Sequence, residues 1–260
     1  MFTTEHFIWI GICLAFVIGM SVLCLKRRLS LKAAGRIMAV ICVFSEISKV
    51  MSDMVKSPSG GMVLSPLSLP FHLCSLMLFG VMFIAFGKAG TAKQAIIDFI
   101  AVTGTIGSIC AILIPTNGTA FTTIHAYQCF IYHGGLLWFS LYLIFFGHAA
   151  LGLKTLARNT GILLLLSLLM LYVNSALSVY DTNFMYLVRP PMEGLPYLNL
   201  AGGWYVYFLR LVALGIVLLS LFHLPFILRQ RSMRKQAANQ RKAQAKKESQ
   251  AIPIPLTEEK

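Results

Sequence analysis

Long apolar runs separated by short polar loops dominate the sequence. Seven segments of about 20 residues are predominantly apolar, several of them nearly uncharged, and this length crosses the hydrocarbon core of a bilayer. The segments cover residues 6–25, 36–54, 69–86, 94–114, 124–146, 161–180 and 204–228. In lipid each segment must satisfy its own backbone hydrogen bonds, which a helix does. The pattern predicts an all-α polytopic membrane protein whose residues 1–228 form seven transmembrane helices.

Positive charge is concentrated in the loops on one side of this predicted bundle. Of the 22 Lys and Arg residues, 18 follow the first, third, fifth and seventh segments. Loops rich in Lys and Arg stay in the cytoplasm, so the amino terminus is predicted outside and the carboxyl terminus inside. The net charge of +13 therefore reflects topology, and we expect no nucleic-acid partner. Residues 229–260 are predicted to form a basic cytoplasmic tail, either mobile or a short interfacial helix.

Composition excludes most other protein classes. Apolar residues make up 57% of the chain and charged residues 12%, whereas soluble domains carry about 25% charged residues. The six cysteines contain no CxxC pair, so neither a disulfide framework nor a zinc ribbon is indicated. We expect a multi-pass cell-membrane protein, with a bacterial plasma membrane favoured and membrane lipids as partners. The oligomeric state is left open.

Polar residues within the predicted helices gather in one leaflet. At 1.5 Å per residue, Glu46 lies about 12 Å and Lys49 about 7 Å below the outer boundary, with His72 and Cys74 at roughly 5–8 Å. The same half holds Asn174, Arg210, His125 and His133. Buried polar groups usually face the bundle interior or a wet cavity, so we infer a polar chamber that opens outward. Alternatively, these groups only join helices, with Glu46 and Lys49 neutralising each other three residues apart.

Two segments carry candidate nucleophiles and bases. In the first, Pro70 suits the start of a helix, which places Cys74 in an early turn where the positive helix end favours a thiolate. In the second, His125, Cys129 and His133 recur every four residues and form one helical stripe. A His base and a Cys nucleophile together permit acyl transfer through a covalent thioester.

The depth of these residues suggests a lipid ester as substrate, because glycerophospholipid esters lie just inside the polar boundary. Cys74 is the predicted nucleophile and His133 the predicted base, with His125 or His72 as the next candidate bases. The same Cys and His residues could instead bind a metal or face a haem, but their spacing matches no strong signature. We therefore expect no metal and no cofactor.

Four stretches, considered together, resemble a known family. They are residues 69–76 (LPFHLCSL), 114–115 with 132–134 (IP and YHG), 181–187 leading to 190–191 (DTNFMYL and PP), and 203–207 (GWYVY). They are similar to the YwaF-like bacterial integral membrane proteins and to their eukaryotic relatives, the transmembrane protein 164 acyltransferases. The last stretch departs from the family, which often has Trp-Pro-Trp-Tyr at the start of the final helix.

The resemblance implies a seven-helix fold. For the eukaryotic branch it implies acyl transfer onto lysophospholipids by a Cys with a His partner, roles that fall on Cys74 and His133. The chain is therefore expected to be a lipid acyltransferase or hydrolase acting on phospholipids or lysophospholipids. The alternative is a non-catalytic lipid- or small-ligand-binding protein or a transporter. The predicted substrate-binding residues are His72, His125, Glu46, Lys49, Asn174 and Arg210. The loop 181–203 is expected to cap the chamber or to form an interfacial aromatic belt.

Overall fold

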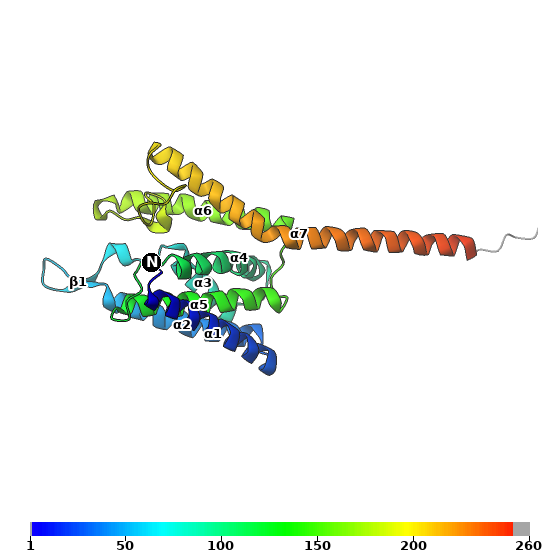
Figure 1. Ribbon diagram of the computed structural model, residues 1–260, viewed down its shortest axis with the longest axis horizontal. Helices are drawn as coiled ribbons and strands as arrows, with labels where there is room; N and C mark the ends of the chain where they lie inside the picture. Colours follow the sequence, from blue (N-terminus) through cyan, green and yellow to red (C-terminus); the bar gives the residue numbers. More distant parts are fainter. Residues whose placement is uncertain (1, 252–260) are drawn as a thin grey trace, which may run out of the picture.

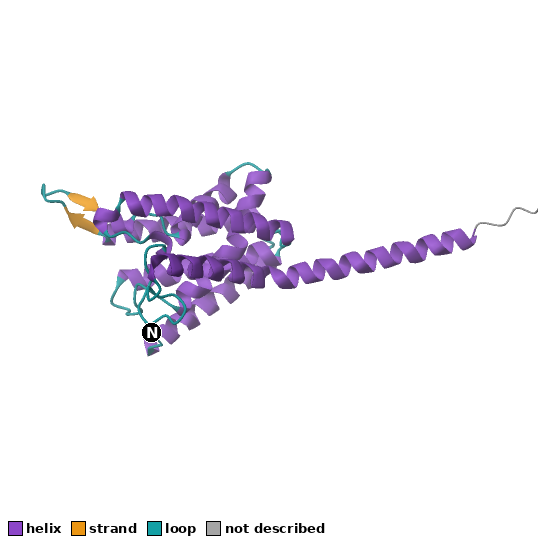
Figure 2. Cartoon of the chain, turned by 90° about the horizontal axis from the view of Figure 1, so that it is seen from above, coloured by secondary structure: helices purple, strands orange, loops and turns teal. Residues whose placement is uncertain are grey.

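A computed structural model describes residues 2–251 of the chain, and the side chains of residues 2–244. Within this range the protein is all-helical apart from one short hairpin (Figures 1 and 2). The helices are α1 (Thr4–Arg27), α2 (Leu31–Ser52), α3 (Leu73–Phe86), α4 (Thr91–Leu113), α5 (Ile124–Phe145), α6 (Leu153–Ala176) and α7 (Gly203–Ala251). Strands β1 (Met54–Lys56) and β2 (Met62–Leu64) pair antiparallel, with Met54 opposite Leu64. The all-helical prediction is confirmed.

Five of the described helices are long and apolar enough to cross a membrane: α1, α4, α5, α6 and α7. Helix α2 has 22 residues but carries Lys32, Arg36, Glu46 and Lys49. Helix α3 has 14 residues, which at 1.5 Å per residue is about 21 Å and shorter than a hydrocarbon core. The predicted number of seven crossings and the predicted orientation of the termini therefore stay predictions.

The start of α3 differs from the prediction. Residues 69–71 form a turn in which Phe71 N donates to Leu69 O at 2.8 Å. Leu69, the residue before the proline, has ψ 147° and lies outside the helical region. Pro70 therefore does not open the helix, and that expectation was wrong. His72 is the residue before the first helical one. Cys74 is the second residue of α3 and lies in its first turn, as expected.

Helices α1 to α5 pack around one hydrophobic core. Helix α5 is central to it, because it packs against α1, α2 and α4 and buries Trp138, Phe139 and Leu143 completely. Helices α6 and α7 form a separate pair along one side of this body (Figure 1). A small apolar cluster of Val102, Leu151 and Leu219 joins that pair to the body. The fold is therefore a five-helix body with a two-helix flank.

Helix α7 continues past the predicted end of the membrane domain at residue 228. It runs without interruption to Ala251, with Pro225 inside it, and Figure 1 shows it extending beyond the other helices. Every side chain from Arg229 to Gln244 is exposed. The first part of the expected tail is thus a continuous helix, and residues 252–260 lie outside the described residues.

Candidate functional site

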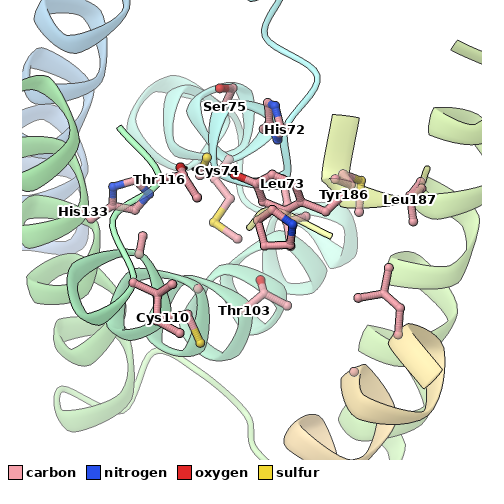
Figure 3. A pocket seen from close by; sticks show the side chains of 18 of the residues that line it. His72, Leu73, Cys74, Ser75, Thr103, Cys110, Thr116, His133, Tyr186 and Leu187 are labelled. Carbon is pink, nitrogen blue, oxygen red and sulfur yellow. Dashed lines mark hydrogen bonds between the residues drawn. The ribbon is translucent and has the colours of Figure 1, made fainter. Parts of the chain in front are cut away.

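A cavity of about 910 Å³ lies between the five-helix body and the α6–α7 flank. Its lining includes six of the eight residues predicted from the sequence to form the site. They are Glu46, Lys49, His72, Cys74, His125 and His133. Figure 3 shows Cys74, from α3, and His133, from α5, among the side chains around this cavity. Asn174 and Arg210 are not among the residues that line it.

Cys74 lies at an uncapped helix end. The side chain of His72 makes no capping hydrogen bond, so the first N–H groups of α3 are available to an anion beside the thiol. Cys74 is a free, half-buried cysteine. The hydroxyl of Tyr132, on α5, donates a short hydrogen bond to the carbonyl oxygen of Cys74. This bond ties the start of α3 directly to α5.

His133 has one ring nitrogen occupied and one free. Its Nδ1 lies 2.8 Å from the carbonyl oxygen of Cys129. A carbonyl only accepts, so in the neutral ring Nδ1 carries the proton and Nε2 keeps its lone pair. Within the described residues no hydrogen bond occupies Nε2. His133 is 9% exposed, and it presents an unprotonated nitrogen next to the cavity.

The cavity lining is polar where α2 ends and α5 begins, and we call this end of the cavity the mouth. Lys49 and Glu46 form an ion pair at 2.7 Å, so they neutralise each other as one sequence alternative held. His125 Nε2 lies 3.4 Å from Asp53 Oδ1 and links α5 to α2, with 41% of the His125 side chain exposed. These groups are therefore paired within the protein while still lining the cavity.

Away from the mouth the cavity lining is mainly apolar, with Thr103, Thr160 and Ser167 as polar exceptions. The side chains contributed there by α6 and α7 include Leu163, Leu164, Leu211, Leu214 and Leu218. A cavity with a polar mouth and an apolar interior matches an amphiphile whose polar end stays at the mouth. Cys74 and His133 line the same space.

The connection between α6 and α7, residues 177–202, covers part of the cavity. Asn174 fixes it through both amide atoms, because Oδ1 accepts from Phe184 N at 2.8 Å and Nδ2 donates to Phe184 O at 3.0 Å. The Tyr207 hydroxyl donates a short bond to Tyr186 O. Met185 and Tyr186, which line the cavity, have φ values of 57° and 55°. Such left-handed conformations in non-glycine residues need surrounding support, which these bonds supply.

Arg210 also serves this connection. Its guanidinium donates to Asn199 Oδ1 at 3.3 Å and lies 5.9 Å from the ring centre of Tyr197. Asn174 and Arg210, both predicted to bind substrate, therefore have their polar atoms directed at the loop, and a direct substrate contact by either stays a prediction.

Sequence reasoning missed two tyrosines. Tyr132, the residue before His133, holds Cys74 from the neighbouring helix. The ring of Tyr186 lies 5.2 Å from that of His72 and its hydroxyl 3.4 Å from Thr116 Oγ1. Burial raises the pKa of Tyr186, so its hydroxyl stays protonated as a donor at neutral pH. Both lie in stretches of family resemblance, and Tyr186 also lies in the loop that was expected to cap the chamber.

The metal alternative depended on several Cys and His residues converging. Among the described residues no group of three or more His, Cys, Asp or Glu side chains is placed to hold a metal ion.

Comparison with known proteins gives a family. The TMEM164 family matches residues 1–223. This confirms the resemblance to the transmembrane protein 164 relatives, whereas assignment to the YwaF-like branch stays a prediction. No curated protein and no solved structure matches the chain.

Proposed function

The chain belongs to the TMEM164 family, and from this premise we propose that it is a membrane acyltransferase acting on phospholipids. The observation that carries the proposal is that a thiol at a helix amino terminus and an imidazole with a free Nε2 line one amphiphile-shaped cavity. The proposal includes seven membrane crossings, an outside amino terminus and a cytoplasmic carboxyl terminus, as the loop charges predict.

The first half-reaction moves an acyl group onto the protein. Nε2 of His133 takes the proton of the Cys74 thiol, and the thiolate attacks the carbonyl carbon of a lipid ester. The negative charge that forms on the carbonyl oxygen meets the uncapped N–H groups of the first α3 turn. The ester C–O bond breaks, the leaving lysolipid oxygen takes the proton from the imidazolium, and a thioester remains on Cys74.

The second half-reaction returns the acyl group to an acceptor. A lysolipid hydroxyl loses its proton to Nε2 of His133 and attacks the thioester carbonyl. The C–S bond then breaks, and the sulfur recovers the proton from His133. Water in place of the lysolipid would give hydrolysis by the same steps.

Cys129 is the competing nucleophile. Its Sγ lies 3.6 Å from Nδ1 of His133, but that nitrogen already donates to a carbonyl and cannot accept the thiol proton. Cys129 is also 4% exposed and lies in the second turn of α5, away from the free N–H groups of a helix start. Cys74 lies in the first turn of α3, beside free N–H groups, and is half-buried.

Acyl-thioester trapping tests the assignment. The purified protein is incubated with a phospholipid that carries an alkyne-tagged acyl chain, and hydroxylamine-sensitive label on the protein is measured. Cys74→Ala should remove the label, and His133→Ala should slow its appearance by roughly 100-fold or more, the usual weight of a general base. Cys129→Ala is the matched control and should label like the parent protein.

Two outcomes would reject the mechanism. Equal labelling of Cys74→Ala and the parent protein would exclude Cys74 as the nucleophile. Absence of label in all variants, together with tight binding of the same phospholipid, would instead favour the non-catalytic lipid-binding alternative. The paired charges at the mouth, Glu46 with Lys49, give that alternative its structural basis.

A further inference from the structure

A second, smaller pocket lies at the opposite end of the bundle from the mouth. It has a volume of about 390 Å³ and sits where α2 and α4 begin. Its lining consists of Ser30, Leu31, Lys32, Ala89, Gly90, Lys93, Gln94 and Ile97. The proposed acyl transfer uses none of these residues, so any role for this pocket is independent of that proposal.

Two helix amino termini converge on this basic pocket. Gly90 precedes α4 and offers no side-chain cap, so the first N–H groups of α4 stay open. At α2 the Ser30 side chain caps Ala33 N at 3.3 Å, which satisfies one of its free N–H groups. Neither helix has an acidic residue in its first turn, although Asp and Glu are the residues that stabilise a helix start.

In both helices the first turn contains a lysine instead of an acidic residue. Lys32 is the second residue of α2 and Lys93 the third residue of α4. A cation at the positive end of a helix is unfavourable unless an anion accompanies it. An exposed lysine such as Lys88, in the preceding loop, would be enough to keep this side of the bundle in the cytoplasm. Orientation in the membrane therefore does not explain why Lys93 is buried.

Lys93 is the decisive residue because it is buried without a counter-ion. Its exposed fraction is 7%, and its Nζ donates to Gly87 O at 3.1 Å. Within the described chain no carboxylate lies within ion-pair distance of it. Asp98, one turn further along α4, is already engaged by Arg158, by Gln94 and by the N–H of Ala150. Buried charges in proteins are normally paired, so a charge and two donors of Lys93 remain for a ligand.

We propose that this pocket binds a phosphate group, held by Lys93, Lys32 and the open N–H groups at the start of α4. A phosphate offers several acceptor oxygens and at least one negative charge, which match an ammonium, a second ammonium and a helix end. The phosphate belongs either to the headgroup of an anionic lipid or to a small soluble phosphate.

Thermal unfolding of the full chain in a neutral detergent tests the proposal and separates the two sources. One arm titrates inorganic phosphate against chloride at equal ionic strength. The other titrates dioctanoyl phosphatidic acid against uncharged dioctanoylglycerol. A ligand that binds only the folded protein raises Tm in a concentration-dependent way. A rise in the lipid arm alone identifies a headgroup, and a rise in the phosphate arm shows that a soluble phosphate suffices.

Three single variants decide whether the effect arises in this pocket. Lys93→Gln and Lys32→Gln should each weaken the apparent Kd by roughly tenfold or more, the weight of one charge-assisted hydrogen bond. Lys88→Gln, an exposed neighbour outside the lining, should bind like the parent protein. If Lys93→Gln fails to fold, the exposed Lys32 still gives a readable variant. Absence of a Tm rise in both arms, or an equal response of all three variants, would overturn the proposal.

Discussion

At the scale of single residues, the position of the Cys74 thiol depends on a tyrosine from another helix. Tyr132 lies on α5 directly before His133, and its hydroxyl bonds the carbonyl of Cys74. One residue pair of α5 therefore supplies both the base and the restraint on the nucleophile. Proton transfer requires the nucleophile and the base to come within hydrogen-bond reach, so we expect this restraint to affect the acylation rate.

Tyr132→Phe should slow acylation of Cys74 while the protein still folds. The substitution removes one hydrogen bond, worth about 1 kcal/mol or up to roughly tenfold in rate, and keeps the buried ring. Thioester formation and Tm are measured on the same preparation. Phe139→Leu, a change in the core away from the cavity lining, is the control and should lower Tm without a selective loss of rate. An unchanged acylation rate in Tyr132→Phe would contradict the positioning role.

At the scale of elements, the connection between α6 and α7 is built from these two helices. Asn174 of α6 bonds the backbone of Phe184 twice, and Trp204 Nε1 of α7 donates to Leu187 O at 3.0 Å. The loop also contacts the segments around the body helices, through Phe184 with Phe71 and through Tyr186 with His72 and Thr116. The hydrogen bonds from Asn174 and Trp204 anchor its backbone to the flank.

Asn174→Ala should loosen this loop. The substitution leaves the buried N–H of Phe184 without a partner, at a cost of about 1–3 kcal/mol, and leaves its C=O with only the 3.4 Å bond from Leu187 N. Tm should fall, and limited proteolysis should cut between residues 177 and 202 faster than in the parent protein. Asn117→Ala, on an exposed neighbouring loop, should change neither quantity. Unaltered cleavage in Asn174→Ala would show that the two amide bonds do not hold the loop.

The elements also show what a sequence can predict. Apolar runs located all seven helices, because a long apolar segment is removed from water and a helix satisfies its own backbone there. Helix ends were less accurate: α3 begins after Pro70 and α7 has no boundary at residue 228. Helical spacing and depth predicted that Cys74 and His133 share one chamber, and both line the cavity. They gave no information on which atoms pair, so Tyr132, the role of Asn174 and the unpaired charge of Lys93 required the three-dimensional contacts.

At the scale of the whole molecule, the cavity exists because two bodies meet at a limited set of contacts. A polar contact joins the body to the flank near the start of α4, where the buried carboxylate of Asp98 on α4 accepts a short hydrogen bond from Arg158 on α6. Asn159 Nδ2 adds a bond to Asp98 O at 3.1 Å. The leucines of α6 and α7 line the cavity further from this link. We therefore expect the bonds of Asp98, together with the apolar cluster of Val102, Leu151 and Leu219, to hold the flank against the body.

Asp98→Asn should weaken the whole assembly. Its carboxylate is 1% exposed and serves an arginine, a glutamine and a backbone N–H. Removing one partner of a buried ion pair costs on the order of 3 kcal/mol, somewhat less here because the Arg158 side chain is 40% exposed. The comparison is Asp181→Asn, which breaks the exposed pair with Arg189 and should change Tm little, since surface pairs contribute little.

A maleimide that enters from the membrane should also label Cys74 faster in Asp98→Asn, because a flank released at this end uncovers the cavity. Equal Tm for the two variants, or unchanged labelling of Cys74, would show that the apolar contacts of Val102, Leu151 and Leu219 hold the bodies together without this ion pair.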